Sequence, residues 1–458
     1  MSLKSINPAN GEEIKSYSEQ SLFQIKEILN SSNLSQKSWS ETKVEFRLEC
    51  LKNLIEILID YKKEYSLLIS KEMGKPLNQS KAEIDKCVTL CGYYFENAEL
   101  FLKDKEIEIK GLKSFVTKQP IGLVLGVMPW NFPFWQVFRF AVPTIISGNG
   151  AILKHASNVQ GCANAIESCF HKSGFPKDIF RNLALIGKNV SKVIEDPMIK
   201  AVSITGSTPA GRAVAETAGR VLKKTVLELG GSDPYIILDD ADIDSAINAC
   251  IDGRILNTGQ SCISAKRIIA VEEIYETFLK KLEKKLNVMI MGDPLDDVDI
   301  GPMVSEKARN ELHHQVNSSV KKGAILHLGG FIPDMKGAFY PVTLLSNVSP
   351  GMVAFDEELF GPVFALIKAE DDNNAIDLAN KTQFGLGAAV FTCDLKKGEE
   401  IAKKRLQAGS CFVNDYVKSD PRLPFGGIKD SGYGRELSDY GMMEFVNIKT
   451  IVIKDSTE

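Results

Sequence analysis

Long apolar runs and an export signal are both missing from this sequence of 458 residues. The most apolar stretch, residues 120–147, is interrupted by Asn131, Pro133, Arg139 and Pro143, so it contains no segment of the length needed to cross a bilayer. Residues 1–13 are polar and do not have the charged start and apolar centre of a secretory signal. We therefore expect neither a membrane span nor export.

The chain also lacks a strong excess of charge of one sign. It has 55 Lys and Arg residues against 59 Asp and Glu residues, a formal net charge of -4 at pH 7. Such a balance provides no broad basic surface for nucleic acid or for an anionic membrane. The expected partner is a small molecule.

Cysteine is present without the spacing of a disulfide or metal framework. The nine cysteines are odd in number and irregularly spaced, which favours free thiols in a reducing cytoplasm. Cys87 and Cys91 are four residues apart, and Cys169 is close to His171, but neither pair completes a zinc-type ligand set. No metal site is predicted.

Apolar periodicity predicts helices in the first hundred residues. One helix is expected from Glu41 to about residue 68, stopped by Gly74 and Pro76, and a second from Gln79 to Leu102. Residues 107–111 alternate apolar and charged side chains before a glycine, which predicts an exposed strand and turn.

From residue 121 onward, short apolar runs alternate with segments of helix length. This alternation predicts an α/β fold with parallel sheets, divided into two α/β regions. No internal repeat or low-complexity linker marks the boundary. The expected strands are residues 121–127, 151–153, 182–186, 201–204 and 226–229 in the first region, and 235–238, 267–271, 363–368 and 388–391 in the second.

Neither the dinucleotide fingerprint GxGxxG nor the phosphate loop GxxxxGK[ST] occurs in the chain. A turn at residues 205–211, containing Gly206 and Ser207, stands between a predicted strand and a predicted helix. Such a turn can approach a pyrophosphate closely, although Gly and Ser in this place also serve simply as turn and helix cap. Its function depends on its surroundings.

Three polar residues are candidates for covalent chemistry. Cys262 lies in a polar loop that contains Gly259, where a thiolate could attack a carbonyl; a lone cysteine is more often structural. Glu228 stands between leucines at a strand end, where burial would raise its pKa toward that of a general base. Asn131 follows a predicted strand and could donate its amide to an oxyanion.

Together these motifs resemble the aldehyde dehydrogenase superfamily over essentially the whole chain. The resemblance implies a Rossmann-like cofactor domain (residues 1–102 and 119–230), an α/β catalytic domain (231–430) and a small β oligomerisation element (103–118 and 431–458). It also implies a homodimer or homotetramer. The motifs that carry it are Pro129–Pro133, Leu227–Gly231, Gly259–Cys262, Glu357–Pro362, Pro424–Gly427 and Gly432–Glu436.

The resemblance assigns catalytic roles residue by residue. Cys262 is similar to the family nucleophile, Glu228 to the general base, and Asn131 to the amide that completes the oxyanion hole. The implied reaction oxidises an aldehyde through a thioester on Cys262, with hydride passing to a nicotinamide cofactor. The implied cofactor-binding residues are Trp130, Asn131, Lys154, Ser157, Gly206, Ser207, Leu229, Glu358 and Phe360.

One position departs from the commonest family pattern and bears on the cofactor. Many NAD-preferring relatives have a glutamate where Ser157 stands, and a glutamate would repel a 2′-phosphate. Lys154 can pair with that phosphate, so NADP is the expected cofactor, with NAD as the alternative. Ser157 and Gln160 also match a helix capping box, which would explain the serine without any cofactor.

For the substrate, the chain resembles the succinate-semialdehyde dehydrogenase branch. Arg139, eight residues after Asn131, and Ser419 match that branch's substrate-carboxylate contacts. Two departures are notable: Leu256 replaces a second arginine of some members, and Ser264 replaces a second cysteine that serves as a redox switch. Arg139 by itself is also compatible with an ion pair on a helix surface.

Other functions remain open at this level. The substrate of an aldehyde dehydrogenase could instead be another short aliphatic, semialdehyde or aromatic aldehyde. A cysteine hydrolase or acyltransferase would also use a loop thiol, but it would normally need a histidine partner, and none of the five histidines has an evident link to Cys262. A non-catalytic descendant of the family is disfavoured by the intact Cys262, Glu228 and Asn131.

Overall fold

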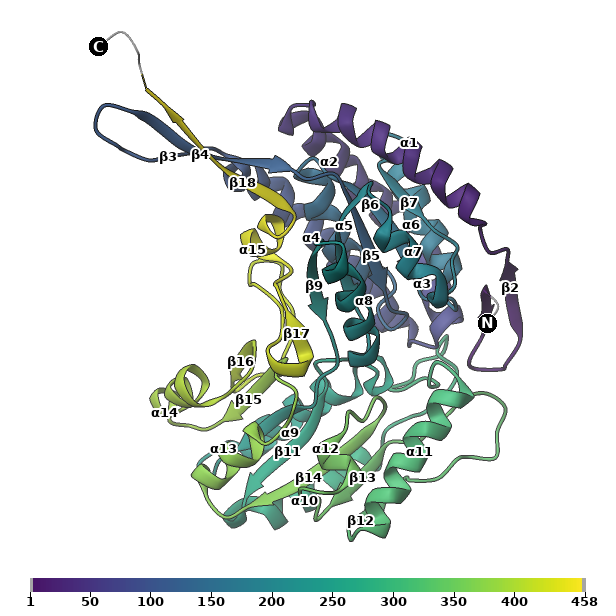
Figure 1. Ribbon diagram of the computed structural model, residues 1–458. Helices are drawn as coiled ribbons and strands as arrows, with labels where there is room; N and C mark the ends of the chain where they lie inside the picture. The colour runs from purple at the N-terminus through teal and green to yellow at the C-terminus, as the bar shows by residue number, and fades with distance from the viewer. Residues whose placement is uncertain (1–2, 455–458) are drawn as a thin grey trace.

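Two helix-covered β-sheets and a projecting β arm make up the protein (Figure 1). The structure is a computed structural model, and it describes residues 3–454. The chain builds one sheet in its first half and another in its second half, then returns to the first sheet and to the arm. None of the helices in residues 3–454 combines the length and the hydropathy that a membrane span needs.

The first sheet has six strands in the order β17-β9-β8-β5-β6-β7. Its neighbours pair in parallel, except that β17 runs antiparallel to β9. Parallel neighbours need long crossovers, and helices supply them here. The strands are β5 (Leu123–Met128), β6 (Gly150–His155), β7 (Phe180–Asn182), β8 (Ile199–Thr205), β9 (Lys224–Glu228) and β17 (Gly432–Tyr433).

Helices cover both faces of this sheet, which is why its strands are almost continuously apolar. Helices α1, α7 and α8 pack on one face around residues such as Ile28 and Val202. Helices α5 and α6 pack on the other face, with α2, α3 and α4 outside them. The helices are α1 (Leu22–Ser40), α2 (Val44–Asp60), α3 (Lys62–Met73), α4 (Leu77–Leu102), α5 (Trp135–Ile146), α6 (Gln160–Lys172), α7 (Val190–Glu195) and α8 (Thr208–Arg220).

The second sheet has seven strands in the order β12-β13-β14-β11-β10-β15-β16, all parallel except β12. Its core is a separate apolar cluster around Ile236, Ile268 and Phe364. The strands are β10 (Asp233–Ile237), β11 (Ala265–Val271), β12 (Ile325–Leu328), β13 (Thr343–Ser346), β14 (Val363–Ala369), β15 (Gly387–Phe391) and β16 (Ser410–Val413). The associated helices are α9 (Ile243–Ile255), α10 (Glu272–Leu286), α11 (Glu306–Lys321), α12 (Val353–Asp356), α13 (Asp372–Asn380) and α14 (Leu395–Glu400).

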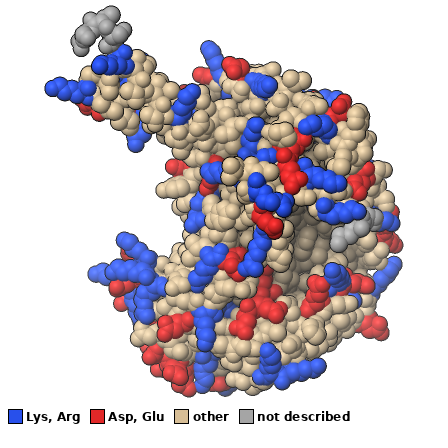
Figure 2. All heavy atoms as spheres, in the orientation of Figure 1, with Lys and Arg blue, Asp and Glu red and all other residues tan. Residues whose placement is uncertain are grey.

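The arm extends away from both sheets (Figure 1). It is a three-stranded antiparallel sheet of β3 (Lys105–Glu106), β4 (Lys113–Pro120) and β18 (Val446–Ile453), in the order β18-β4-β3. Helix α15 (Ser438–Met443) precedes β18, and a hairpin of β1 (Leu3–Ile6) and β2 (Glu13–Tyr17) lies at the other end of the chain. On the face shown in Figure 2, basic and acidic side chains are interspersed.

The predicted α/β fold with a Rossmann-like sheet is confirmed, and the differences are local. The helix expected from Glu41 is two helices, α2 and α3, separated at Tyr61, and Gly74 closes α3 in the left-handed conformation with φ of 82°. The strand expected at residues 182–186 is wrong: β7 ends at Asn182, and Leu183 and Leu185 pack in the apolar core beyond its end.

Candidate active site

Cys262 lies in a loop that the backbone holds in an unusual conformation. The loop follows the short helical turn η2 (Leu256–Gly259), in which Asn257 and Thr258 have φ of 55° and 56°. Such conformations are costly for residues with a side chain, so neighbouring contacts must hold them. The Asn257 amide donates to the carbonyls of Asn131 and Gln260, at 2.8 and 3.1 Å. The loop is thereby tied to the segment after β5.

A cavity of about 290 Å³ brings most of the predicted site residues together. Segments that follow the carboxyl ends of β5, β8 and β9 form one wall, which is where open α/β sheets bind ligands. The Cys262 loop and the segment before β14 form the other wall. The predicted residues that line it are Trp130, Asn131, Gly206, Ser207, Leu229, Cys262, Glu358 and Phe360.

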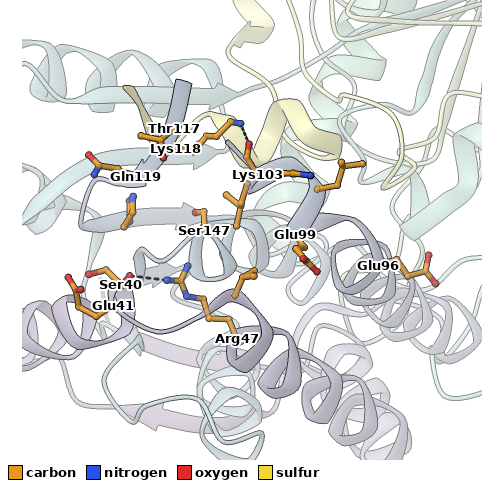
Figure 3. Close-up of a pocket in the computed structure, with 14 residues that line it drawn as sticks. Ser40, Glu41, Arg47, Glu96, Glu99, Lys103, Thr117, Lys118, Gln119 and Ser147 are labelled. Carbon is orange, nitrogen blue, oxygen red and sulfur yellow. Dashed lines mark hydrogen bonds between the residues drawn. The ribbon is translucent and has the colours of Figure 1, made fainter. Parts of the chain in front are cut away.

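The same wall also contains Thr205, which belongs to the predicted turn at residues 205–211, and Gln136, which was not predicted from the sequence. Gln136 is a polar residue within the apolar run of α5, and this was the available signal for it. A wider cleft of about 1090 Å³ shares Trp130, Glu358 and Phe360 with the cavity, so the two are contiguous. None of the predicted site residues lines the hollow at the base of the arm, beside Arg47 and Lys118 (Figure 3).

Two glycines after Glu228 allow the two walls to approach each other. A Cβ on Gly231 would lie 2.6 Å from the Cys262 carbonyl oxygen, and a Cβ on Gly230 would lie 2.6 Å from Oε2 of Glu358. A side chain at either position would displace the Cys262 loop or the Glu358 carboxylate. The Gly230–Gly231 pair is therefore part of the site geometry.

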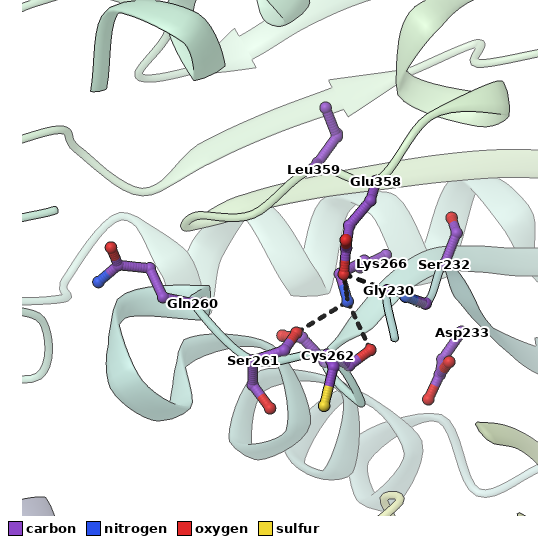
Figure 4. A network of polar contacts seen from close by, with 12 residues as sticks. Gly230, Ser232, Asp233, Gln260, Ser261, Cys262, Lys266, Glu358 and Leu359 are labelled. Carbon is purple, nitrogen blue, oxygen red and sulfur yellow. Dashed lines mark hydrogen bonds and ion pairs between the residues drawn. The ribbon is translucent and has the colours of Figure 1, made fainter. Parts of the chain in front are cut away.

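Burial and nearby charges act in opposite directions on the Cys262 thiol. Burial raises its pKa to about 11, while the cations of Lys266 and Arg139 lower it and the carboxylates of Glu358 and Asp233 raise it. Because the thiolate is the nucleophile, the two cations favour the reactive form. Figure 4 shows Lys266 beside the Cys262 loop, bound to its carbonyls.

Asn131 is close to the Cys262 loop in this structure. Its amide donates to the Gln260 carbonyl at 3.1 Å, and its side chain is only 4% exposed. Asn131 and Cys262 line the same cavity. A donor already fixed in place beside a thiol is suited to hold a developing oxyanion.

Glu228 is buried behind the cavity and does not line it. It ends β9, is 2% exposed, and neither of its carboxylate oxygens has a hydrogen-bond partner among the described residues. Burial is the larger cause that raises the pKa of Glu228 well above its ordinary value, and the charge of Glu436 adds to it. The cations of Arg139 and Arg435 lower this pKa but do not cancel the effect. The carboxyl is next to Gly426, where a Cβ would lie 2.7 Å from Oε1.

Arg139 is buried, so the expectation of an ion pair on a helix surface is wrong. It lies on α5, is 2% exposed, and forms an ion pair with Glu436. Its Nη2 donates to Thr205 Oγ1 at 3.4 Å, and Thr205 lines the cavity. Arg139 is therefore one side chain removed from the cavity wall, on the apolar face that packs against the first sheet.

Ser419 is bound by a lysine that the sequence analysis did not consider. Lys86 Nζ, from α4, donates to Ser419 Oγ at 2.8 Å and lies 4.4 Å from the centre of the Trp135 ring. Within residues 3–454, Lys86 forms no ion pair. Burial and the charge of Arg139 lower the pKa of Lys86 to about 8. Lys86, Arg139 and Ser419 form a cluster with excess positive charge, which we call the basic cluster.

Lys154 is the penultimate residue of β6, Ser157 follows this strand, and neither residue lines the cavity. Burial lowers the pKa of Lys154, and in the described part of the chain its ammonium forms no ion pair. The capping box expected for Ser157 is wrong: α6 begins at Gln160 with Val159 as its N-cap and no side-chain cap bond. Gln160 instead donates to the Ala156 carbonyl at 3.1 Å.

No histidine is found among the residues that line the Cys262 cavity, taken over residues 3–454. His155, which ends β6, contacts the carbonyls of Met128 and Pro133, and burial lowers its pKa to about 4. A thiol–histidine pair of the kind used by cysteine hydrolases is therefore not part of this cavity.

The fold and the site together define an aldehyde dehydrogenase. The model of the Aldehyde dehydrogenase family matches residues 1–451, so the chain belongs to this family. Among curated relatives, it is 44% identical to a succinate semialdehyde dehydrogenase [NAD(P)+] of Escherichia coli (strain K12), over 98% of this chain and 97% of that protein. It is 41% identical to a probable succinate-semialdehyde dehydrogenase [NADP(+)] of Synechocystis, over 99% and 100%.

Solved structures agree with this assignment. The succinic semialdehyde dehydrogenase of Streptococcus pyogenes, in complex with NADP+, superposes with a TM-score of 0.96 at 34% identity, covering 99% of this chain and 100% of that one. A structure of Gox0499, from work on its cofactor and substrate selection, superposes with a TM-score of 0.97 at 38% identity, covering 98% and 99%.

Proposed function

We propose that this protein oxidises succinate semialdehyde to succinate, with NADP as the preferred cofactor and NAD as the alternative. The observation that carries the proposal is the basic cluster near a cavity that contains Cys262, Asn131 and Glu358. Sequence similarity over nearly the whole chain to enzymes named for this substrate supports the proposal.

In the proposed reaction, the Cys262 sulfur adds to the aldehyde carbon. The new alkoxide accepts hydrogen bonds from the Asn131 amide and the Cys262 backbone N–H. Loss of hydride from that carbon, with both electrons of its bond, leaves a thioester on Cys262; when bound, the nicotinamide cofactor supplies the hydride acceptor. Glu228 then removes a proton from a water molecule, and the water oxygen adds to the thioester carbon. The carbon–sulfur bond breaks, which releases the acid and returns Cys262 to the thiol.

The residues around β6 and β8 fit a phosphorylated dinucleotide. Lys154 is a buried ammonium without an acidic partner in residues 3–454, and Ser157 stands nearby with no capping role. Ser207 is the N-cap of α8 and makes no side-chain cap bond, so this helix N-terminus has donors to offer a phosphate. Glu358 and Phe360, at the cavity, would face the nicotinamide end.

The basic cluster supports a substrate with a carboxylate. Lys86 has no acidic partner in the described chain, and Arg139 has one, Glu436. A dicarboxylate semialdehyde would supply the missing negative charge at its acid end, while its aldehyde end reaches Cys262. An uncharged aldehyde would leave the charge of Lys86 unpaired.

We also propose a homodimer or homotetramer in a reducing, cytoplasmic compartment. Strand β18 is an edge of the arm, with Ile448 61% and Val452 52% exposed, and an unpaired apolar edge is commonly covered by another chain. All nine cysteines lie within residues 3–454 and are free thiols.

The test is a panel of aldehydes measured as reduced-cofactor absorbance with NADP and with NAD. Succinate semialdehyde is compared with glutarate semialdehyde, butanal and benzaldehyde. We expect succinate semialdehyde with NADP to have the highest kcat/KM. Lys86→Met should lower this value by about tenfold to a hundredfold, as loss of a charged hydrogen bond would, and leave butanal nearly unchanged. Arg139→Ala should lower the value for succinate semialdehyde more than the value for butanal, which also falls because Arg139 lowers the pKa of the Cys262 thiol.

Lys418→Met is the matched control, because Lys418 adjoins Ser419 but pairs with Asp415 at 2.5 Å. A wild-type enzyme that turns over butanal as efficiently as succinate semialdehyde would contradict the proposed substrate. A clear preference for NAD would contradict the proposed cofactor.

A further inference from the structure

Lys266 is a buried lysine that bridges the nucleophile loop and the Glu358 carboxylate. It is the second residue of β11, four residues after Cys262, and its side chain is 1% exposed. Its Nζ donates to the carbonyls of Ser261 and Cys262, at 2.8 and 2.7 Å, and lies 3.1 Å from Glu358 Oε1 (Figure 4). These three acceptors match the three hydrogens of an ammonium group.

The bond to the Ser261 carbonyl bears directly on the oxyanion site. That carbonyl and the Cys262 N–H belong to one peptide unit, and in a trans peptide the two groups point in opposite directions. By fixing the carbonyl on its own side, Lys266 also fixes the direction of the Cys262 N–H. The Asn257–Gly259 turn before it has left-handed φ values, so this peptide needs an external anchor.

Glu358 is held from two sides. Its Oε1 forms an ion pair with Lys266 and accepts a hydrogen bond from the Gly231 N–H at 3.1 Å. Its side chain is 21% exposed, at the cavity that also contains Cys262. Lys266 and Glu358 together therefore join the three segments that bear Cys262, Glu358 and Gly231.

Stability alone does not account for a charge in this place. Burying an ion pair costs desolvation that its own attraction roughly repays, and apolar replacements are often neutral. The position of this charge, beside a thiol that must ionise, does have a chemical consequence, because a cation stabilises the thiolate. Burial raises the pKa of Cys262, Lys266 lowers it and Glu358 raises it.

We infer that Lys266 is a positioning residue for the nucleophile: it aligns the Cys262 N–H as an oxyanion donor, stabilises the thiolate and orients Glu358. The inference does not depend on which aldehyde or cofactor is used. Glu358 and Lys266 act in opposite directions on the thiol, so removing each gives an opposite result.

The experiment follows alkylation of Cys262 by iodoacetamide in the full-length protein without cofactor, between pH 7 and pH 9, with the modified peptide quantified by mass spectrometry. Lys266→Gln should slow alkylation about tenfold at a given pH, since one unit of pKa changes the thiolate fraction by that factor. Lys266→Arg should restore most of the rate. Glu358→Gln should accelerate it, because the lysine then acts unopposed.

Lys223→Gln is the matched control, since Lys223 also bridges two backbone carbonyls, those of Ile194 and Asp196, but not at the cavity. In the aldehyde assay, Lys266→Gln should lower kcat more than it changes KM, because an oxyanion donor acts mainly in the transition state. An unchanged or faster alkylation rate in Lys266→Gln would overturn the inference. If Lys266→Gln does not fold, an alkylation rate of Glu358→Gln equal to or below that of the wild type overturns the inference.

Discussion

At the scale of single residues, Glu228 has the most demanding environment in the site. It is a carboxyl with no hydrogen-bond partner in the described chain, beside a second buried carboxylate, Glu436. Its raised pKa keeps it protonated to a higher pH in the folded protein than in the unfolded chain. The proposed base, which must ionise in order to act, is therefore held in a place that opposes ionisation.

This environment has a consequence for stability. The folded state binds more protons than the unfolded state once the pH exceeds the ordinary carboxyl pKa of 4.5, so the contribution of Glu228 to the free energy of unfolding falls as pH rises. Glu228→Gln removes this penalty. We expect the Tm of the variant, measured by calorimetry, to exceed that of the wild type at pH 8. The difference should be smaller at pH 5.

Glu216→Gln is the control, because the Glu216 side chain is 75% exposed. A Tm difference between Glu228→Gln and wild type that is the same at both pH values would show that Glu228 titrates normally in the folded protein. The same variant should also lose steady-state turnover, because the proposed thioester would no longer be hydrolysed efficiently.

At the scale of elements, the arm is the feature that a lone subunit does not explain. Strands β4 and β18 pair over eight positions, from Val446 with Pro120 to Ile453 with Lys113, and project away from both sheets (Figure 1). The outer side of β18 has no neighbouring strand in the part of the chain described. Exposed strand edges promote pairing with another chain, which is the expected role of this arm.

We predict that replacing Ile448 and Val452 together by Asp weakens the assembly, because charged side chains on an edge strand oppose its pairing with another strand. Light scattering coupled to size-exclusion chromatography should show wild type as a multiple of the 50.5 kDa chain and the double variant shifted toward a single chain. Leu34→Asp, at an exposed apolar position on α1 that is 66% exposed, should leave the assembly intact. A wild-type protein that elutes as a single chain would contradict the proposed oligomer.

At the scale of the whole molecule, the cavity joins the two sheets. One wall follows β5, β8 and β9 of the first sheet, and the other contains Cys262 and Glu358 from the second. A ligand between them contacts both halves of the chain, so its binding energy adds to the stability of the folded molecule as a whole.

Cofactor binding should therefore raise Tm. At a concentration one hundred times its Kd, a ligand adds about 2.7 kcal/mol, which for a chain of this size corresponds to about 3 °C. In a thermal-shift assay, we expect NADP to raise Tm more than NAD at equal concentration. Ser157→Glu should reverse the order, because the new carboxylate repels the 2′-phosphate, while Ser157→Ala should not. If Ser157→Glu leaves the NADP shift intact, Ser157 does not face the adenosine ribose.

Much of this organisation was accessible from the sequence. The alternation of apolar runs and helical segments predicted the α/β fold, because strand burial on both faces leaves a continuous apolar run. The family motifs predicted eight residues that do line the Cys262 cavity. Where local pattern was ambiguous the predictions were wrong: residues 183–186 are apolar because they pack in the core, not because they form a strand.

The domain boundaries proposed from the resemblance stay a prediction, but the structure shows why sequence cannot easily define them. Residues 432–433 form β17 and pair with β9 of the first sheet, although the chain has meanwhile built the whole second sheet. A contact between segments this far apart leaves no local pattern in either of them.

The sequence by itself determined most of the elements and the family, and it predicted the reactive side chains, because periodicity and motif spacing are local properties of the chain. Only the tertiary structure decided what surrounds those side chains: that Arg139 pairs with Glu436, that Lys86 holds Ser419, and that Lys266 bridges Cys262 and Glu358. The physical reason is that a side chain's pKa and orientation depend on burial and on charges brought close by distant segments.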